Sequence, residues 1–271
     1  MAETFDSNHI SEEYLLEYYR KARNKPWQEC GEEYLSDPGG RFRMELLLEE
    51  LYRIEPENLL DLGCGSMVLG TLIEGRIRTD YFGCDIADIE NGQGAKFFLS
   101  DVSETGIRDE AFQAVVCSEV LEHLYDPERG IREIYRIMRN NGYALITVPN
   151  LFSFDSIDGA TGVISGPLRI ISEAGLSKRW EHGINVHVTR QSPSKWRKMI
   201  QDSGLEIEME RAVYLFPYIP YIIKPLKKLE TRLFSSVPAA EFWQKLERRI
   251  AYLPPLNRLG QFHYFRCRKN S

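Results

Sequence analysis

The sequence is poor in cysteine and has no long apolar run, and each absence narrows the classes of protein it can represent. None of its 5 cysteines stands in a C-x-x-C pair, so we expect neither a disulfide framework nor a zinc site, and a reducing cytoplasmic location fits best. No stretch approaches about 18 uninterrupted apolar residues, the length that a membrane-spanning helix needs. The acidic start MAETFDSNHI lacks the basic and apolar regions of a secretory signal.

Charge is unevenly distributed along the 271 residues. The net charge is −6, but residues 211–271 carry 12 Lys and Arg against 3 Glu, which leaves −15 for the rest of the chain. A basic segment on an acidic protein favours an anionic partner, such as a phosphorylated substrate, a nucleotide-linked sugar or a lipid surface. A solvated surface without any partner explains the same segment equally well. Because the whole chain is acidic and has no recognisable reading motif, we do not expect it to bind nucleic acid.

Strand and helix patterns alternate in the middle of the chain. Two helical patterns, at 11–25 and 41–54, come first and are separated by a DPGG turn. Short apolar runs then predict strands from 59 into a glycine turn and at 81–86, 96–100, 111–120 and 143–149, with helices at 67–75 and 127–139. A helix that starts at Ser192 and ends at Gly204, a strand to 208 and a last strand at 261–269 follow. This alternation predicts a mostly parallel sheet with right-handed crossovers.

Small and acidic residues stand at the ends of four of these predicted strands. Gly63 and Gly65 end the first strand and would let the backbone approach a ligand closely. Asp85, at the end of the second strand, can accept both hydroxyls of a ribose, and Asp101, after the third, could accept from an adenine amino group. The fourth strand closes with CSEVLEH (117–123). Ligands of open α/β sheets bind at the carboxyl ends of the strands, so these residues predict a nucleotide-type site.

Taken together, these segments resemble a class I S-adenosylmethionine-dependent methyltransferase, of the group that includes ubiquinone-biosynthesis enzymes. The matching segments are LLDLGCG (59–65), GCD (83–85), SDV (100–102), CSEVLEHL (117–124) and NNGYALITVPN (140–150). The resemblance is strong over 57–150 and weaker over 187–207. Met67 departs from the pattern, because the family often has a third glycine there. A dinucleotide site would also prefer that glycine, which argues against an NAD-dependent oxidoreductase.

The resemblance implies a fold and a division of the chain. The fold is Rossmann-like α/β, with a seven-stranded, mostly parallel sheet flanked by helices, N-terminal helices and an inserted segment that covers the substrate. We expect one overall domain in four parts: an N-terminal helical cap (1–56), the cofactor-binding core (57–150), the substrate-covering insertion (151–190), and the C-terminal part of the sheet with a basic helical extension (191–271).

The resemblance also implies the cofactor, S-adenosylmethionine, its product S-adenosylhomocysteine, and the residues around them. By position, Asp61, Gly63, Cys64 and Gly65 would surround the methionine part, Asp85 would hold the ribose, Ile86 would lie beside the adenine, Asp101 and Val102 would contact the adenine, and Glu119 would lie near the methionine and the mouth of the substrate site. The family often grips the methionine carboxylate with a residue before the first strand. Arg41 is the candidate for that role; the alternative is that Arg41 is simply a solvent-exposed residue of its helix.

Three histidines are candidates for a catalytic base, which a hydroxyl acceptor would need. His187 matches a frequent family histidine on the substrate side, and His182 lies close to it in the sequence. His123 follows the fourth strand, where a structural hydrogen bond is the favoured interpretation. A packed or solvated histidine remains the alternative for each. No cluster of residues indicates a metal, so we expect a metal-independent mechanism.

The sequence thus predicts transfer of a methyl group to a small or medium metabolite, most simply to a hydroxyl of a sugar-, phosphate- or lipid-linked acceptor. N- or C-methylation of a small molecule is an alternative, and so is a catalytically idle protein that binds S-adenosylmethionine and acts as a partner. The apolar, proline-containing segment and lysines within 213–232 could contact a membrane peripherally, form a homodimer contact, or simply pack.

Overall fold

The computed structural model describes residues 38–87, 96–150, 191–214 and 260–271, together with isolated positions at 35, 189, 242, 245, 246, 249 and 253. The helix predicted at 11–25, nearly all of the insertion predicted at 151–190 and most of the 213–232 segment lie outside these residues. The four cysteines that are described, at 64, 84, 117 and 267, are free and buried. No helix within the described ranges is long and apolar enough to cross a membrane.

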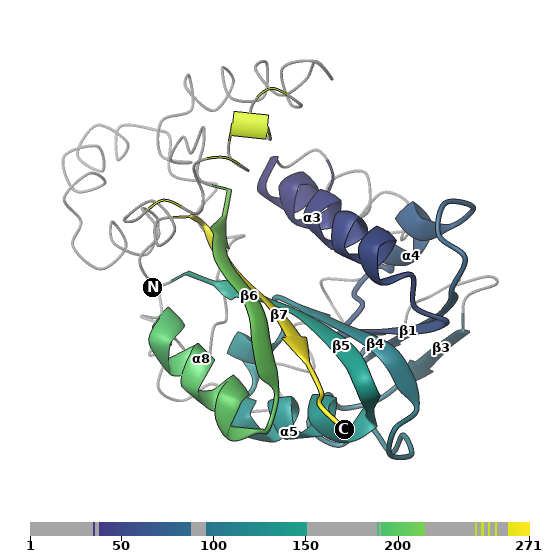
Figure 1. Ribbon diagram of the computed structural model, residues 1–271. Coiled ribbons are helices and arrows are strands. Elements are labelled where there is room, and N and C mark those ends of the chain that lie inside the picture. The colour runs from purple at the N-terminus through teal and green to yellow at the C-terminus, as the bar shows by residue number, and fades with distance from the viewer. Residues whose placement is uncertain are drawn as a thin grey trace, which may run out of the picture.

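A seven-stranded sheet forms the centre of the molecule, in the order β3-β2-β1-β4-β5-β7-β6 (Figure 1). All neighbouring pairs from β3 to β5 are parallel, whereas β7 is antiparallel to both β5 and β6. The sheet therefore confirms the predicted Rossmann-like, mostly parallel architecture. The strands are β1 Asn58–Leu62, β2 Asp80–Asp85, β3 Lys96–Leu99, β4 Phe112–Ser118, β5 Met138–Pro149, β6 Glu206–Val213 and β7 Phe262–Arg268.

Helices cover both faces of this sheet (Figure 1). Helices α3 (Pro38–Ile54) and α4 (Val68–Ile73) pack on one face with a cluster that includes Leu47 and Leu59. Helices α5 (Pro127–Ile137) and α8 (Pro193–Asp202) pack on the other, where Leu60 belongs to a second cluster. Strands between two helical layers have no polar face, which explains why their sequences are continuous apolar runs.

Local sequence signals set the helix boundaries, with two corrections. The side chain of Asp126 caps α5 by accepting from Arg129 N at 2.9 Å, and Ser192 caps α8 as predicted. The DPGG segment, predicted as a turn, instead supplies Pro38 as the first residue of α3. Helix α5 ends at Ile137 rather than at 139, because the backbone of Met138 is extended and already pairs with Phe112.

Candidate functional site

The turn after β1 brings the backbone close to the loop after β4. Gly63 has a φ of 76° and Gly65 one of 55°, in the left-handed region that favours glycine. A Cβ on Gly63 would lie 2.4 Å from Val120 Cγ2, so only glycine fits there. The amides of Gly63 and Cys64 both donate to Cys84 O, at 2.9 and 3.0 Å, which ties the turn to β2. The turn lies at the switch point between β1 and β4, where ligands of such sheets bind.

Met67, which stands where the sequence departs from the family pattern, has a left-handed backbone conformation of the kind that favours glycine. Its φ is 54° and its ψ 33°, which places it in the left-handed region just before α4. An L-residue with a side chain adopts this conformation at a cost of roughly 1–2 kcal/mol. Glycine would adopt this conformation without that cost, so the position still suits the glycine that the family often has there.

Asp85 fixes the same turn from the end of β2. Its Oδ2 accepts from Gly65 N at 2.9 Å and its Oδ1 accepts from Ala87 N at 3.2 Å. A carboxylate at the end of this strand is chemically suited to accept from the hydroxyls of a ligand. Beside it, Ile86 is 36% exposed, and Leu99, which pairs with Asp85 across β2 and β3, is 57% exposed. A carboxylate next to exposed apolar side chains suits a ribose joined to a flat base.

Asp61 is buried under this turn, where the hydroxyl of Tyr81 donates to Asp61 Oδ2 at 2.7 Å. Burial raises the pKa of Asp61 to about 7; the hydrogen bond from Tyr81 opposes this shift, and the nearby Asp85 adds to it. With this pKa, the carboxyl of Asp61 changes its protonation state near neutral pH. The sequence pattern does not distinguish Tyr81, because a tyrosine inside a strand usually serves packing.

The raised pKa of Asp61 predicts a pH-dependent contribution to stability. In the unfolded chain an aspartate has a pKa of about 3.9, so between about pH 4 and pH 7 the folded protein holds the proton that the unfolded chain has lost. Stability from this group is therefore present at low pH and is lost as pH rises towards 7. Relative to Asp61→Asn, the wild type should lose up to about 4 kcal/mol of unfolding free energy between pH 4 and pH 8.

Urea titrations at several pH values measure this difference. Asp80→Asn, an exposed aspartate at the opposite end of β2, is the matched control and should leave the pH profile parallel to that of the wild type. Parallel profiles for Asp61→Asn as well would show that Asp61 does not titrate abnormally.

An arginine from α3 meets the acidic residues after β4. Arg43 Nη1 lies 3.2 Å from Glu119 Oε2, and its guanidinium stacks 4.5 Å from the centroid of the Phe262 ring. Glu119 has a φ of 57° and donates its amide to Thr147 O. Burial raises the pKa of Glu119, and Arg43 counteracts this effect. Glu122 is 2% exposed, and burial together with Glu119 raises its pKa well above the usual range.

Arg43 is the residue that the sequence reasoning missed. The sequence favours Arg41 instead, whose Nε donates to Leu35 O at 3.1 Å, and its role in holding a carboxylate stays a prediction. The spacing of the sequence could have identified Arg43. It lies four residues before Leu47 and eight before Leu51, which places it on the same helix face as these two fully buried leucines. An arginine on the apolar stripe of a helix must reach a buried partner, which indicates a site rather than a surface.

The segment after Glu119 forms a short 3₁₀ turn, Leu121–His123. His123 Nε2 lies 3.6 Å from Glu122 Oε1, and Thr189 donates its amide to Glu122 O and its hydroxyl to Leu124 O. His123 thus lies beside a buried carboxyl, whereas His182 and His187 are outside the described residues and remain predictions. Within the described ranges, no group of three or more His, Cys, Asp or Glu side chains is arranged to hold a metal ion.

The loop after β3 holds the remaining predicted residues. Asp101 Oδ1 accepts from Ser103 N at 2.6 Å, which closes a local turn. The side chain of Val102 is only 5% exposed and packs in the core beneath α5. Val102 can therefore offer a ligand its backbone but not its side chain. The thiol of Cys64 is likewise buried, so the main chain of that residue is the part near the turn.

One known protein family and several known proteins are similar to this chain. The model of a family described as "Methyltransferase domain" matches residues 33–210, which is more than half of the chain. The chain is 25% identical over 107 residues to a probable S-adenosylmethionine-dependent methyltransferase of Mycobacterium tuberculosis, covering 38% of this chain and 39% of that protein. It is 26% identical over 181 residues to the mitochondrial ubiquinone biosynthesis O-methyltransferase of Bos taurus, covering 60% of this chain and 45% of that protein.

Among solved structures, the chain is similar to a [4+2]-cyclase, with a TM-score of 0.55 and 16% identity, covering 92% of this chain and 84% of that one. This likeness concerns the fold alone, and it illustrates that one fold carries different reactions. The chain spans less than half the length of the two curated relatives named above.

Proposed function

The chain belongs to the methyltransferase family whose domain model matches residues 33–210, and on that premise we propose that it transfers a methyl group from S-adenosylmethionine to a hydroxyl of a small or medium metabolite. The family model shows a methyltransferase domain, and one relative is named a probable S-adenosylmethionine-dependent methyltransferase, which supports this cofactor. The acceptor, the atom that is methylated and the residues that hold the cofactor form the proposal.

The proposed cofactor site depends on one observation: the carboxyl ends of β1, β2, β3 and β4 bring Gly63, Asp85, Asp101 and Glu119 to the same edge of the sheet. The glycine turn places its backbone at the switch point, where the methionine part would lie, and Asp85 stands at the end of β2, where a carboxylate can accept the ribose hydroxyls. Exposed Ile86 lies next to Asp85 and offers an apolar surface for the adenine. These features fit an adenosyl group and do not require a metal.

When bound, the sulfonium of S-adenosylmethionine supplies an activated methyl group, so the protein chiefly binds and orients. Orientation of the acceptor towards the methyl group contributes up to roughly 7–11 kcal/mol in the best cases. Glu119 and Arg43, at the switch point, would border both the methionine part and the acceptor. If the acceptor is a hydroxyl, a base that takes its proton adds roughly 10²–10⁴-fold, and His123, His182 and His187 are the candidates.

The hydroxyl acceptor is favoured over nitrogen or carbon because one relative is named an O-methyltransferase. A neutral amine acceptor would not need a base, so the pH dependence of turnover separates the two cases. A protein that binds S-adenosylmethionine without turnover would have the same cofactor site and would fail every acceptor assay.

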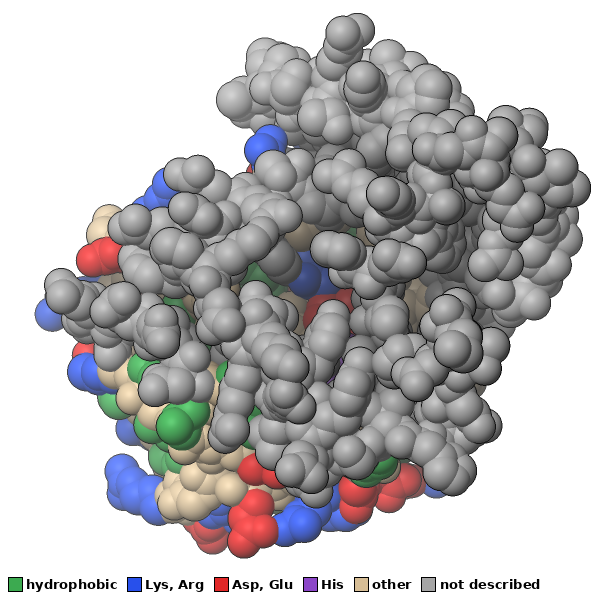
Figure 2. Space-filling model, turned by 180° about the vertical axis from the view of Figure 1, so that it is seen from behind, with side chains coloured by type: hydrophobic (Ala, Val, Ile, Leu, Met, Phe, Trp, Pro, Cys, Tyr) green, Lys and Arg blue, Asp and Glu red, His purple; other side chains and the backbone are tan. Residues whose placement is uncertain are grey.

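The proposed acceptor is anionic or linked to a sugar, phosphate or lipid because of the basic excess in 211–271. Within the described residues of this segment, Arg266 pairs with Glu50, Arg268 with Glu208 and Lys269 with Glu110, so the proposal depends on the charge excess in the sequence. Charges outside the segment pair in the same way, as Lys198 does with Asp202 and Arg132 with Glu128. On the face drawn in Figure 2, basic and acidic side chains lie next to each other along the lower edge. Peripheral membrane contact through 213–232, a homodimer and a cytoplasmic location belong to the same proposal.

Calorimetry of S-adenosylmethionine binding to the wild type and to Asp85→Ala tests the cofactor site. Loss of two ribose hydrogen bonds to a carboxylate should weaken binding by about 100-fold or more. Asp80→Ala, on the same strand at its other end, should bind as the wild type does. A folded wild type that binds neither S-adenosylmethionine nor S-adenosylhomocysteine would contradict the proposal. Micromolar binding justifies a screen of phosphorylated and sugar-linked hydroxyl acceptors.

A further inference from the structure

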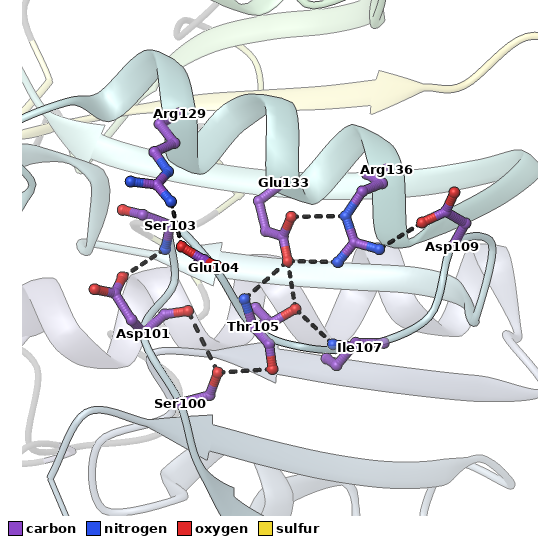
Figure 3. A network of polar contacts seen from close by, with 10 residues as sticks. All are labelled: Ser100, Asp101, Ser103, Glu104, Thr105, Ile107, Asp109, Arg129, Glu133 and Arg136. Carbon is purple, nitrogen blue, oxygen red and sulfur yellow. Dashed lines mark hydrogen bonds and ion pairs between the residues drawn. The ribbon is translucent and has the colours of Figure 1, made fainter.

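A buried carboxylate on α5 holds the loop that follows β3. Glu133 Oε1 accepts from the amide of Thr105 at 2.8 Å and from its hydroxyl at 2.5 Å. These bonds join residues 28 positions apart and are buried (Figure 3). Both oxygens of Glu133 also accept from Arg136, from Nε at 2.8 Å and from Nη2 at 2.7 Å. Burial alone would raise the pKa of Glu133, but the bonds from Arg136 and Thr105 outweigh it and lower the pKa.

Arg136 is itself fixed from the other end of the loop. Its Nη1 lies 2.5 Å from Asp109 Oδ1, so one guanidinium joins the helix carboxylate to the far end of the segment that carries Thr105 (Figure 3). Planar bidentate pairing of this kind restrains orientation as well as distance. Glu133 therefore presents its oxygens to Thr105 in one fixed geometry.

Ser100 connects Thr105 to Asp101. The hydroxyl of Ser100 donates to Thr105 O at 3.0 Å and lies 3.3 Å from Asp101 O. The amide of Glu104 donates to Asp101 O at 3.1 Å, and Ser103 N donates to Asp101 Oδ1. Residues 100–105 thus form a closed loop, called here the β3 loop, which is attached to α5 through Thr105. One oxygen of Asp101, Oδ2, is not used in the hydrogen bonds of this turn.

We propose that Glu133, held by Arg136, is a positioning residue that sets the protein's preference for the amino group of adenine by fixing the β3 loop and its Asp101. The inference rests on the proposed function. A carboxylate at a fixed position accepts from an adenine amino group but repels the carbonyl oxygen that replaces it in hypoxanthine. Discrimination of this kind is large only when the acceptor cannot move away.

S-adenosylhomocysteine and S-inosylhomocysteine are the probes, since they differ only in the purine 6-substituent and in the hydrogen that the 6-oxo form carries on N1. Calorimetry gives their dissociation constants for the wild type, Glu133→Gln and Thr105→Val. The wild type should prefer the adenosyl compound by at least about tenfold. In Glu133→Gln and Thr105→Val the preference should fall to about threefold or less, with weaker adenosyl binding and little change for the inosyl compound. Thr105→Val keeps the shape and the amide bond, so it serves if Glu133→Gln fails to fold.

Glu128→Gln is the matched control, because it makes the same change on the same helix at an exposed pair with Arg132, and it should retain the wild-type preference. If the variants bind both probes more weakly by the same factor, the preference is unchanged. Glu133 then acts on stability alone and the inference is wrong. It is also wrong if the wild type binds both probes equally well, an outcome that leaves the proposed function intact. Only a wild type that binds neither probe removes the proposed function together with the inference.

Discussion

Arg43→Met is expected to lower the unfolding free energy by roughly 3–5 kcal/mol and to abolish measurable binding of S-adenosylmethionine. Arg43 is the cation that faces Glu119, and Glu122 lies beside both with its own pKa raised. Removal of one partner of a buried pair leaves an uncompensated charge, which costs more than the pair contributes. Because Glu119 can escape this cost by taking up a proton, the loss should be larger at pH 8 than at pH 5.

A double-mutant cycle separates this effect from loss of packing on Phe262. Arg43→Met with Glu119→Gln removes both charges and should recover most of the lost stability, whereas Arg43→Lys keeps a charge and should retain part of the coupling. Urea unfolding at the two pH values provides the free energies. If the double variant is as unstable as Arg43→Met at both pH values, the ion pair is not the cause.

Gly63→Ala should be strongly damaging to both stability and cofactor binding. Its backbone conformation costs an L-residue roughly 1–2 kcal/mol, and the new Cβ would overlap Val120, so at least one loop at the switch point must move. We expect a total loss of about 3 kcal/mol or more, with cofactor affinity reduced by more than about tenfold, because the turn itself is displaced.

Gly75→Ala isolates the conformational part of this cost. Gly75 has a φ of 68°, and a Cβ added there would meet no atom within 4 Å, so its substitution should cost only the backbone strain and leave binding unchanged. Val120→Ala added to Gly63→Ala should return the part of the loss that comes from overlap. Urea unfolding and calorimetry measure both quantities, and equal losses for the two glycine variants would show that the contact with Val120 is unimportant.

Local patterns predict most of the fold and locate several candidate site residues at the ends of strands. Apolar runs that end in glycine or aspartate locate β1 and β2 to within a residue or two, because buried parallel strands leave a continuous signal. Asp85 and Gly63 follow from their places at strand ends. The same patterns place the end of α5 too late, because Met138 is apolar in either a helix or a strand and its pairing with Phe112 is a tertiary choice.

The residues that escape prediction act across long sequence separations. Arg43 and Glu119 are joined only by the fold, and the same is true of Thr105 and Glu133. Hydrophobic periodicity describes one helix or strand at a time. It can therefore place Arg43 on a buried helix face, but it cannot identify the residue that Arg43 contacts. Tyr81 escapes for the same reason, since its bond to Asp61 depends on the register of β1 and β2.

The place of β7 has a consequence for how the chain folds during synthesis. In the sheet β7 lies between β5 and β6, although it comes last of the seven strands in the sequence. Until the ribosome has released residues 262–268, the strands on either side have no hydrogen-bonded connection, and β5 has an open edge. Arg266 then binds Glu50 and Lys269 binds Met138 O, contacts across 216 and 131 positions. The sheet can therefore be completed only after all of its other strands have been synthesised. A nascent chain that stalls before this point exposes the edge of β5, which can pair with other chains.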